Sequence, residues 1–256
     1  MGTVNLFEAV KNINSVKVLI NVTSDKCYEN KEWVYGYREI DPLGGYDPYS
    51  SSKACSELIT NAYRNSFFKD KAIALSSVRA GNVIGGGDWA EDRLIPDCIR
   101  ALCQNKTIII RNPQAIRPWQ YILEPLSGYL WLGALMYRDN INYSSSWNFG
   151  PVEDDIITVE DVVRLTLKYW GNGDYALDTA VHPHEASLLK LDCSKAHSIL
   201  KWQPVYNTYK AIEETIHWYK EYYNIKDKDK MNAITISQIE GYVKEARNKK
   251  IPWCIN

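Results

Sequence analysis

Short apolar runs alternate with helical patterns along the first half of the chain. Residues 16–22 and 72–78 are apolar over most of their length and rich in β-branched side chains. Such runs are typical of strands buried on both faces of a parallel sheet. Residues 3–13 and 49–68 carry apolar side chains three and four positions apart, which predicts helices. This alternation predicts an α/β protein with a parallel sheet.

The rest of the chain carries the same two patterns. A near match to the nucleotide-binding pattern G-x-G-x-x-G, at residues 171–176, follows a helical run rather than a strand and therefore predicts a helix C-terminal turn. Residues 226–230 alternate in charge and predict a solvated linker. We expect further helices at 94–103, 123–137, 158–169 and 211–222, one ending at Leu200 and capped by Asp192 or Ser194, and strands at 107–110 and 146–150.

Polar side chains stand directly after the first predicted strand. Ser24, Asp25 and Lys26 follow the apolar run that ends at Val22. In open parallel sheets, ligands bind beyond the carboxyl ends of the strands. These three side chains are therefore candidates for a binding or catalytic site.

The helix that begins near Pro48 carries a second candidate pair. Asp47 is a good N-cap and Pro48 suits the first helical position. Tyr49 and Lys53 are four positions apart and share one helical face. The lysine cation favours the phenolate, which can accept a proton from an alcohol. The spacing alone is weak support, but its context after a strand that ends near Ser24 favours a functional role.

Composition excludes several classes of partner. The chain has 256 residues and a net charge of −1, which gives no reason to expect nucleic acid or an anionic membrane. No apolar run reaches transmembrane length. The six cysteines show no metal-binding spacing, so we expect free thiols in a cytoplasmic protein. We predict no metal site at His182 and His184, because Pro183 breaks their shared face and no third ligand is placed.

A series of motifs in one order resembles the extended short-chain dehydrogenase/reductases of nucleotide-sugar metabolism, and within them the 4,6-dehydratases. The resemblance runs from about residue 1 to at least residue 223. A series of motifs is more specific than any single one. The motifs that carry it lie at residues 22–28, 36–39, 47–50, 79–90, 117–120 and 191–196.

The resemblance implies a Rossmann-like parallel sheet, N-terminally incomplete, with a smaller C-terminal α/β substrate domain. It implies NAD as cofactor and CDP-glucose as substrate, which would become CDP-4-keto-6-deoxyglucose in deoxysugar and O-antigen biosynthesis. Tyr49 would accept the C4 hydroxyl proton, Ser24 would orient that oxygen, and Lys53 would hold the nicotinamide ribose. Asp25 would be the acid at the C6 hydroxyl and Lys26 the base at C5.

The role of Lys26 stays open, because related dehydratases carry a glutamate there. A lysine is a base only when neutral, which burial or a neighbouring cation would favour. Alternatively, Lys26 pairs with Asp25 and the base lies elsewhere.

By the same resemblance, further residues would bind the nucleotide sugar. Arg117 would clamp the diphosphate, which suits a planar and permanently charged guanidinium. Asn82, Asn148 and Glu185 would contact the phosphates or the sugars. Tyr121 stands where the pattern has a histidine. The loop at residues 28–47 is either a cover for the sugar or an ordinary surface loop.

The resemblance also implies a homodimer and a domain division. Helices 3–13 and 49–68 would pair with their copies in the dimer. Residues 1–88 would be the remaining part of a dinucleotide-binding domain, 89–223 mostly a nucleotide-sugar-binding region with segments that return to the first domain, and 224–256 a linker and tail.

The largest departure from the family pattern lies at the start. No glycine-rich turn stands before residue 16, and Met1 matches an internal position of the pattern. We therefore expect weak NAD binding or none. The alternatives are a truncated chain that only dimerises or binds nucleotide sugar, or a related nucleotide-sugar epimerase or decarboxylase.

Overall fold

The chain folds into two compact units, each built from segments that are distant in the sequence. The computed structural model describes residues 1–71, 73–152, 157–178, 180, 188–225 and 227–255. Unit 1 comprises residues 1–81, 125–150 and 189–203, and unit 2 the remainder. The predicted boundaries at residues 88 and 223 therefore fall within unit 2.

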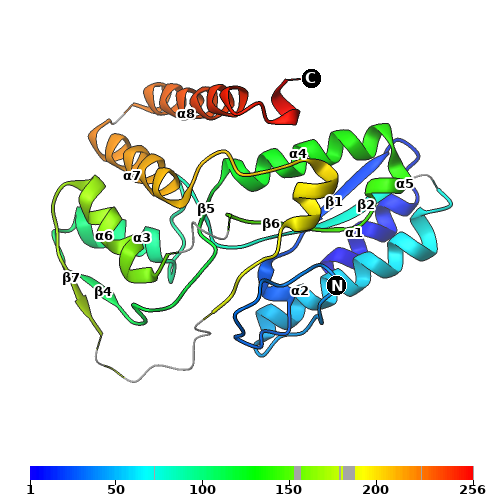
Figure 1. Cartoon of the computed structure of the whole chain (residues 1–256), viewed down its shortest axis with the longest axis horizontal. Helices are drawn as coiled ribbons and strands as arrows, with labels where there is room; N and C mark the ends of the chain where they lie inside the picture. Colours follow the sequence, from blue (N-terminus) through cyan, green and yellow to red (C-terminus); the bar gives the residue numbers. More distant parts are fainter. Residues whose placement is uncertain (72, 153–156, 179, 181–187, 226, 256) are drawn as a thin grey trace. The chain divides into compact units, whose positions relative to one another are not determined.

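Unit 1 contains a parallel sheet with the strand order β1-β2-β6. Helices α1 and α2 cover one face of this sheet and α4 covers the other (Figure 1). The predicted α/β class with a parallel sheet is confirmed. The elements of this unit are β1 (Val18–Val22), β2 (Ala74–Ala80), β6 (Ser146–Phe149), α1 (Gly2–Lys11), α2 (Pro48–Tyr63), α4 (Leu123–Arg138), α5 (Asn140–Tyr143), the 3₁₀ turn η1 (Asp25–Cys27) and the π-helical turns η2 (Arg64–Phe68) and η4 (Ala196–Leu200).

The face of the sheet that packs against α2 has an apolar part and a polar part. Leu19 and Leu75 pair in register and pack with Phe7 and Phe68. Two residues further along β1, Asn21 lies on the same face. Its amide donates hydrogen bonds to Ser56 (3.0 Å) and Thr60 (2.7 Å) of α2. The sheet therefore holds α2 through side-chain hydrogen bonds as well as apolar contact.

Strand β1 differs from its prediction. The apolar run predicts burial on both faces, but in the described chain β1 lies at the edge of the sheet and none of its residues is fully buried. Val22 is 54% exposed. The reason is that, among the described residues, β1 pairs on one side only, with β2.

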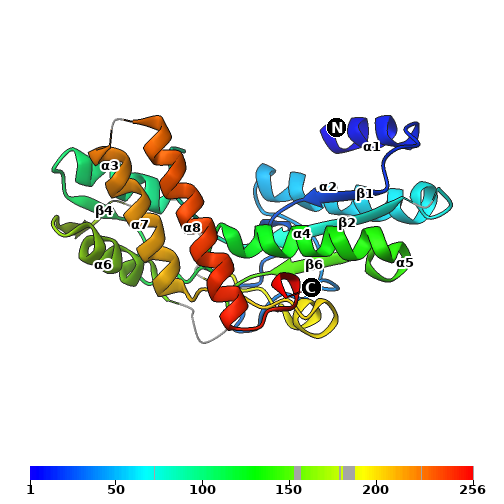
Figure 2. The ribbon, with the colours of Figure 1, turned by 90° about the horizontal axis from the view of Figure 1, so that it is seen from above.

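In its described residues, unit 2 combines four helices with two short parallel strand pairs, β3-β5 and β4-β7. Helices α3, α6, α7 and α8 lie together (Figure 2). Buried apolar side chains such as Ile99, Ile212 and Ile216 form its core. The elements are β3 (Val83–Ile84), β5 (Gln120–Tyr121), β4 (Ile108–Ile110), β7 (Tyr175–Leu177), α3 (Leu94–Cys103), α6 (Val159–Trp170), α7 (Thr208–Asn224), α8 (Lys228–Asn248) and the 3₁₀ turn η5 (Pro252–Cys254).

Two predicted helix ends are confirmed in unit 2. Thr158 caps α6 and forms a reciprocal capping box with Asp161. Gly171 ends the same helix with a φ of 103°, the left-handed conformation that glycine adopts readily. The glycines at 171 and 173 therefore belong to a helix C-terminus.

Helix α8 begins at Lys228, inside the linker predicted at residues 226–230. Asp227 accepts hydrogen bonds from the backbone N–H groups of Asp229 and Lys230 and so caps α8. Tyr242 and Ala246 of α8 then enter the core. The alternating charges favoured a linker in the sequence. One of them, Asp227, is instead a helix cap, and the helix that follows buries one of its faces.

Gly86 lies under an aromatic side chain of unit 2. A Cβ atom at this position would stand 2.1 Å from Cδ2 of Trp218. Trp218 in turn stacks on Tyr222, with the ring centroids 5.5 Å apart. The absence of a side chain at residue 86 is therefore a packing requirement.

Glu124 is completely buried in the first turn of α4, whose first two residues belong to unit 2 and the rest to unit 1. Its carboxylate accepts hydrogen bonds from the backbone N–H groups of Val205 (2.8 Å) and Tyr206 (2.7 Å) and from the Tyr242 hydroxyl (2.8 Å). Burial raises the pKa of Glu124 to about 7, against the opposing effect of these donors.

This raised pKa predicts a pH-dependent stability. The unfolded chain releases the Glu124 proton near pH 4.5, whereas the folded chain keeps it to about 7. The free energy of unfolding should therefore fall by up to about 3 kcal/mol as the pH rises from 4.5 to 7. Urea unfolding of Glu124→Gln should show a flatter pH dependence over this interval. The exposed Glu91→Gln is the matched control, and identical pH profiles for parent and Glu124→Gln would contradict the expectation.

Candidate functional site

The polar turn after β1 has the geometry of a capped 3₁₀ turn. Ser24 Oγ accepts a hydrogen bond from the Lys26 backbone N–H (3.2 Å) and donates one to Asp25 Oδ1 (3.0 Å). Asp25 is buried, whereas Ser24 and Lys26 are half-buried. The turn thus holds a hydroxyl, a carboxyl and an amine on three consecutive residues.

The start of α2 holds the predicted tyrosine–lysine pair. Asp47 caps the helix by accepting from the Ser50 N–H (3.0 Å) and hydroxyl (2.6 Å), and these hydrogen bonds lower the pKa of Asp47. Lys53 Nζ lies 5.8 Å from the ring centroid of Tyr49. Tyr49 is 55% exposed, so its phenol is open to a ligand. Helix α2 packs against η1, which brings the turn and the helix together within unit 1.

A buried polar network lies behind these residues. Glu57 accepts hydrogen bonds from the hydroxyls of Thr23 and Ser77 and from the Arg79 guanidinium (2.7 Å). Burial alone would raise the pKa of Glu57, but Arg79 and the hydroxyl donors outweigh it and the pKa lies below its ordinary value. The Arg79–Glu57 ion pair is therefore charged, with side chains only 2% and 1% exposed.

The network continues from Arg79 to Asn148. Arg79 donates to the Tyr28 hydroxyl (2.7 Å), which donates to Asn148 Oδ1 (2.8 Å). The Asn148 amide nitrogen donates to the backbone oxygens of Tyr37 (2.7 Å) and Asp192 (3.1 Å). Asn148 is fully buried. Asn148 thus holds this network together, and its contact with the substrate stays a prediction.

The loop at residues 28–47 begins with a stack of aromatic rings. The Tyr28 and Tyr37 rings stack with centroids 5.1 Å apart, and Trp33 stacks on Tyr37 at 5.4 Å. The Arg79 guanidinium lies 4.8 Å from the Tyr28 ring centroid, on the buried side. The loop therefore has its own aromatic packing, whereas its role as a cover for the sugar stays a prediction.

The remaining predicted substrate residues belong to unit 2 or lie outside the described residues. Arg117 donates to the Ile116 carbonyl (2.9 Å), and the Asn82 carbonyl accepts from the Gln120 N–H (3.0 Å). Glu185 lies outside the described residues, as do His182 and His184.

Tyr121 stands in the core of unit 2. Its side chain is 3% exposed, and its hydroxyl donates to Gln238 of α8 at 3.2 Å. Burial raises the pKa of this phenol. The residue that replaces the expected histidine therefore packs in the core and contacts α8.

Sequence reasoning gave Thr23, Glu57 and Arg79 no role at the site, although Thr23 and Arg79 lie in the motifs at residues 22–28 and 79–90. One signal was available: Glu57 follows Lys53 by four residues and therefore continues the face that begins at Tyr49. A second was the polar Ser77 inside the run predicted to be buried at 72–78, with Arg79 two positions further and just beyond that run.

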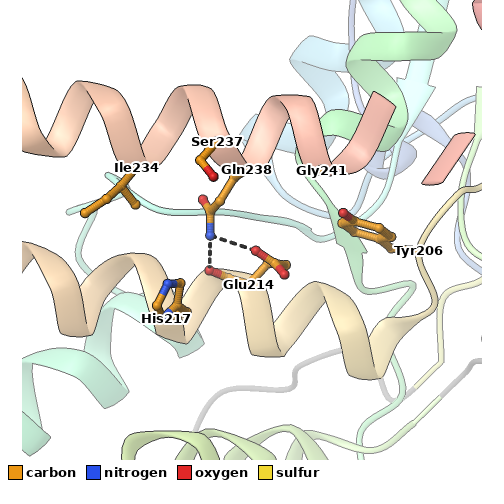
Figure 3. Close-up of a pocket in the computed structure, with 7 residues that line it drawn as sticks. All are labelled: Tyr206, Glu214, His217, Ile234, Ser237, Gln238 and Gly241. Carbon is orange, nitrogen blue, oxygen red and sulfur yellow. Dashed lines mark hydrogen bonds between the residues drawn. The ribbon is translucent and has the colours of Figure 1, made fainter. Parts of the chain in front are cut away.

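A separate pocket of about 260 Å³ lies between α7 and α8 of unit 2. Figure 3 shows Gln238 of α8 donating to the backbone and side-chain oxygens of Glu214 of α7. None of the predicted catalytic residues lines this pocket. Its lining is Tyr206, Glu214, His217, Ile234, Ser237, Gln238 and Gly241.

The described residues offer no metal site and no membrane span. Within the ranges given above, no three His, Cys, Asp or Glu side chains are grouped to hold a metal ion. In the same part of the chain, no helix has the length and apolar character needed to cross a membrane.

Comparison with known proteins identifies the family. A family model described as GDP-mannose 4,6 dehydratase matches residues 1–215. The chain belongs to this family. The resemblance to nucleotide-sugar dehydratases found in the sequence is thereby confirmed.

Two curated 4,6-dehydratases show the range of similarity within the family. The CDP-glucose 4,6-dehydratase of Salmonella typhimurium is 51% identical over 233 residues, which cover 89% of this chain and 65% of that protein. A dTDP-glucose 4,6-dehydratase of Haemophilus influenzae is 26% identical, over 86% of this chain and 68% of that protein. The chain thus spans about two thirds of the length of these relatives.

Solved structures share the fold. A dTDP-glucose 4,6-dehydratase from Bacillus anthracis, in complex with NAD, superposes with a TM-score of 0.70 at 23% identity, over 86% of this chain and 66% of that one. A UDP-glucuronic acid 4-epimerase from Bacillus cereus gives 0.73 at 22%, with the same coverage. These likenesses confirm the Rossmann-type fold predicted from the sequence.

Proposed function

We propose that the chain carries the catalytic residues of a nucleotide-sugar 4,6-dehydratase that converts CDP-glucose into CDP-4-keto-6-deoxyglucose. The observation that carries this proposal is the packing of the Ser24–Asp25–Lys26 turn against the helix that presents Tyr49 and Lys53. The 51% identity to a CDP-glucose 4,6-dehydratase supports the choice of reaction and substrate.

The proposed roles of the residues rest on the resemblance to the family, and the positions of Tyr49, Lys53 and Ser24 support them. Tyr49, half-exposed and beside the Lys53 ammonium, accepts the proton of the C4 hydroxyl, and Ser24 donates a hydrogen bond to the same oxygen. The 4-keto group acidifies the C5 proton. Lys26 removes that proton, and Asp25 protonates the departing C6 hydroxyl. Adjacent residues on one turn can reach adjacent carbons of one sugar.

The exposed part of this site fits a nicotinamide cofactor. Lys53 lies one helical turn from Tyr49, with neither side chain fully buried, so its ammonium can hold the nicotinamide ribose. NAD, when bound, supplies a hydride acceptor at C4 and a hydride donor at C6. Release of cofactor from denatured protein would measure how much NAD the chain binds.

The direct test is the product. Incubation with CDP-glucose and excess NAD should yield a nucleotide sugar that has lost one water and carries a 4-keto-6-deoxy group, identified by mass spectrometry and NMR. Recovery of a C4 epimer would instead indicate an epimerase. Unchanged CDP-glucose at saturating NAD would contradict the proposal.

The proposed base gives a sharper prediction. Lys26→Ala should lower the rate of hydrogen–deuterium exchange at C5 of the 4-keto intermediate by about 10²- to 10⁴-fold, because general-base catalysis contributes that much. NMR in D₂O measures this exchange directly. Lys31→Ala removes an exposed lysine of the neighbouring loop and is the matched control. Exchange at the parent rate in Lys26→Ala would place the base elsewhere.

Further parts of the proposal concern the nucleotide and the assembly. Arg117 and Asn82 are proposed to bind the diphosphate region, and helices α1 and α2 to form a homodimer.

Leu6 and Leu58 are 53% and 58% exposed on helices α1 and α2, which supports an apolar contact between two copies there. Leu58→Glu should shift the sedimenting species from dimer to monomer, whereas Ile239→Glu, on an exposed face of α8, should not. A parent chain that sediments as a monomer would contradict the dimer.

A further inference from the structure

Helix α2 joins the reactive residues to the buried network. Tyr49, Lys53 and Glu57 are spaced by four residues, so they lie on one face of the helix. Along this face, exposure falls from 55% at Tyr49 to 2% at Glu57. Glu57 lies about 12 Å along the axis from Tyr49. One helix thus carries the proposed proton acceptor at its open end and a buried carboxylate further along.

Glu57 also reaches the turn that bears the other reactive residues. Its Oε1 accepts a hydrogen bond from the hydroxyl of Thr23, the residue immediately before Ser24. The other oxygen accepts Ser77 Oγ (2.6 Å) and the Arg79 guanidinium (2.7 Å), both from β2. The two carboxylate oxygens therefore connect α2 to two different places: the reactive turn on one side and the sheet interior on the other.

We propose that Thr23 and Glu57 are positioning residues, which fix the Ser24–Asp25–Lys26 turn in place relative to Tyr49 through the hydrogen bond between the Thr23 hydroxyl and the Glu57 carboxylate. Arg79 holds that carboxylate charged and oriented. The effect of the Thr23–Glu57 hydrogen bond on catalysis rests on the proposed function, whereas its effect on the conformation of the turn does not.

The test compares two hydroxyls on the same carboxylate. Thr23→Val removes the donor that reaches the turn and keeps a similar shape, and Thr23→Ser restores the hydroxyl. Ser77→Ala is the matched control, because it removes a hydroxyl donor that comes from β2 rather than from the turn. Hydrogen exchange followed by mass spectrometry on peptides covering residues 23–28 reports the amides of Lys26, Cys27 and Tyr28, which bond within the turn.

Loss of one such hydrogen bond should raise exchange in this peptide roughly five- to thirtyfold in Thr23→Val. Thr23→Ser should restore the parent rate, and Ser77→Ala should leave it unchanged. In turnover assays, Thr23→Val should lower kcat with KM unchanged, and Ser77→Ala should not. Equal exchange in Thr23→Val and Ser77→Ala, or parent exchange in Thr23→Val, overturns the proposal. If exchange responds as expected but even the parent chain makes no product, the positioning role stands and the proposed function fails.

Discussion

Replacing Arg79 with methionine is expected to lower the free energy of unfolding by about 3–5 kcal/mol, because the change leaves a buried carboxylate without its partner. The Arg79 and Glu57 side chains are 2% and 1% exposed, so water cannot take the place of the lost guanidinium. The Tyr28 hydroxyl loses its donor from Arg79 in the same change. Denaturant unfolding measures the loss directly.

The matched control is an arginine at the surface. Arg164 pairs with Glu160 on α6 with 61% of its side chain exposed. Arg164→Met should cost at most about 1 kcal/mol, as is usual for exposed ion pairs. A double variant, Glu57→Met with Arg79→Met, should recover part of the loss because no unpaired charge remains. Similar losses for Arg79→Met and Arg164→Met would contradict the importance of the buried pair.

Changing Tyr49 to phenylalanine should have the largest effect on the proposed reaction. The phenol is the proposed acceptor of the C4 hydroxyl proton, and loss of such a group costs about 10²- to 10⁴-fold in rate. Because Tyr49 is half-exposed, the variant should keep the stability of the parent. Formation of 4-keto-6-deoxy sugar at saturating CDP-glucose and NAD is the measurement.

Tyr46→Phe provides the comparison for this experiment. Tyr46 lies three residues before Tyr49, and its side chain is fully exposed. It should retain the parent rate. A Tyr49→Phe chain that turns over as fast as Tyr46→Phe would remove Tyr49 from the mechanism.

The sequence predicts well whatever depends on neighbours along the chain. Asp47 caps α2 as expected, and the spacing of Tyr49 and Lys53 places them on one face. The hydrogen bonds of the Asn148 amide could not be predicted in this way, because their partners lie more than 40 positions away in the sequence.

The same limit applies to the buried network and to β1. Glu57 and Arg79 are 22 residues apart and on different elements, so the residues next to each of them do not predict their ion pair. The apolar character of β1 predicts burial, but burial depends on which strands lie beside it, and β1 pairs only with β2 in the described chain. The linker predicted at 226–230 failed because one aspartate at its edge acts as a helix cap.

The close packing of Gly86 against Trp218 means that the residues allowed at these two positions depend on each other. A Cβ at residue 86 would overlap the indole ring, so alanine is accommodated there only if a smaller side chain replaces the tryptophan. Homologues should therefore keep this glycine with this tryptophan or change both. A library that randomises the two positions jointly should recover folded combinations that neither single-site library contains.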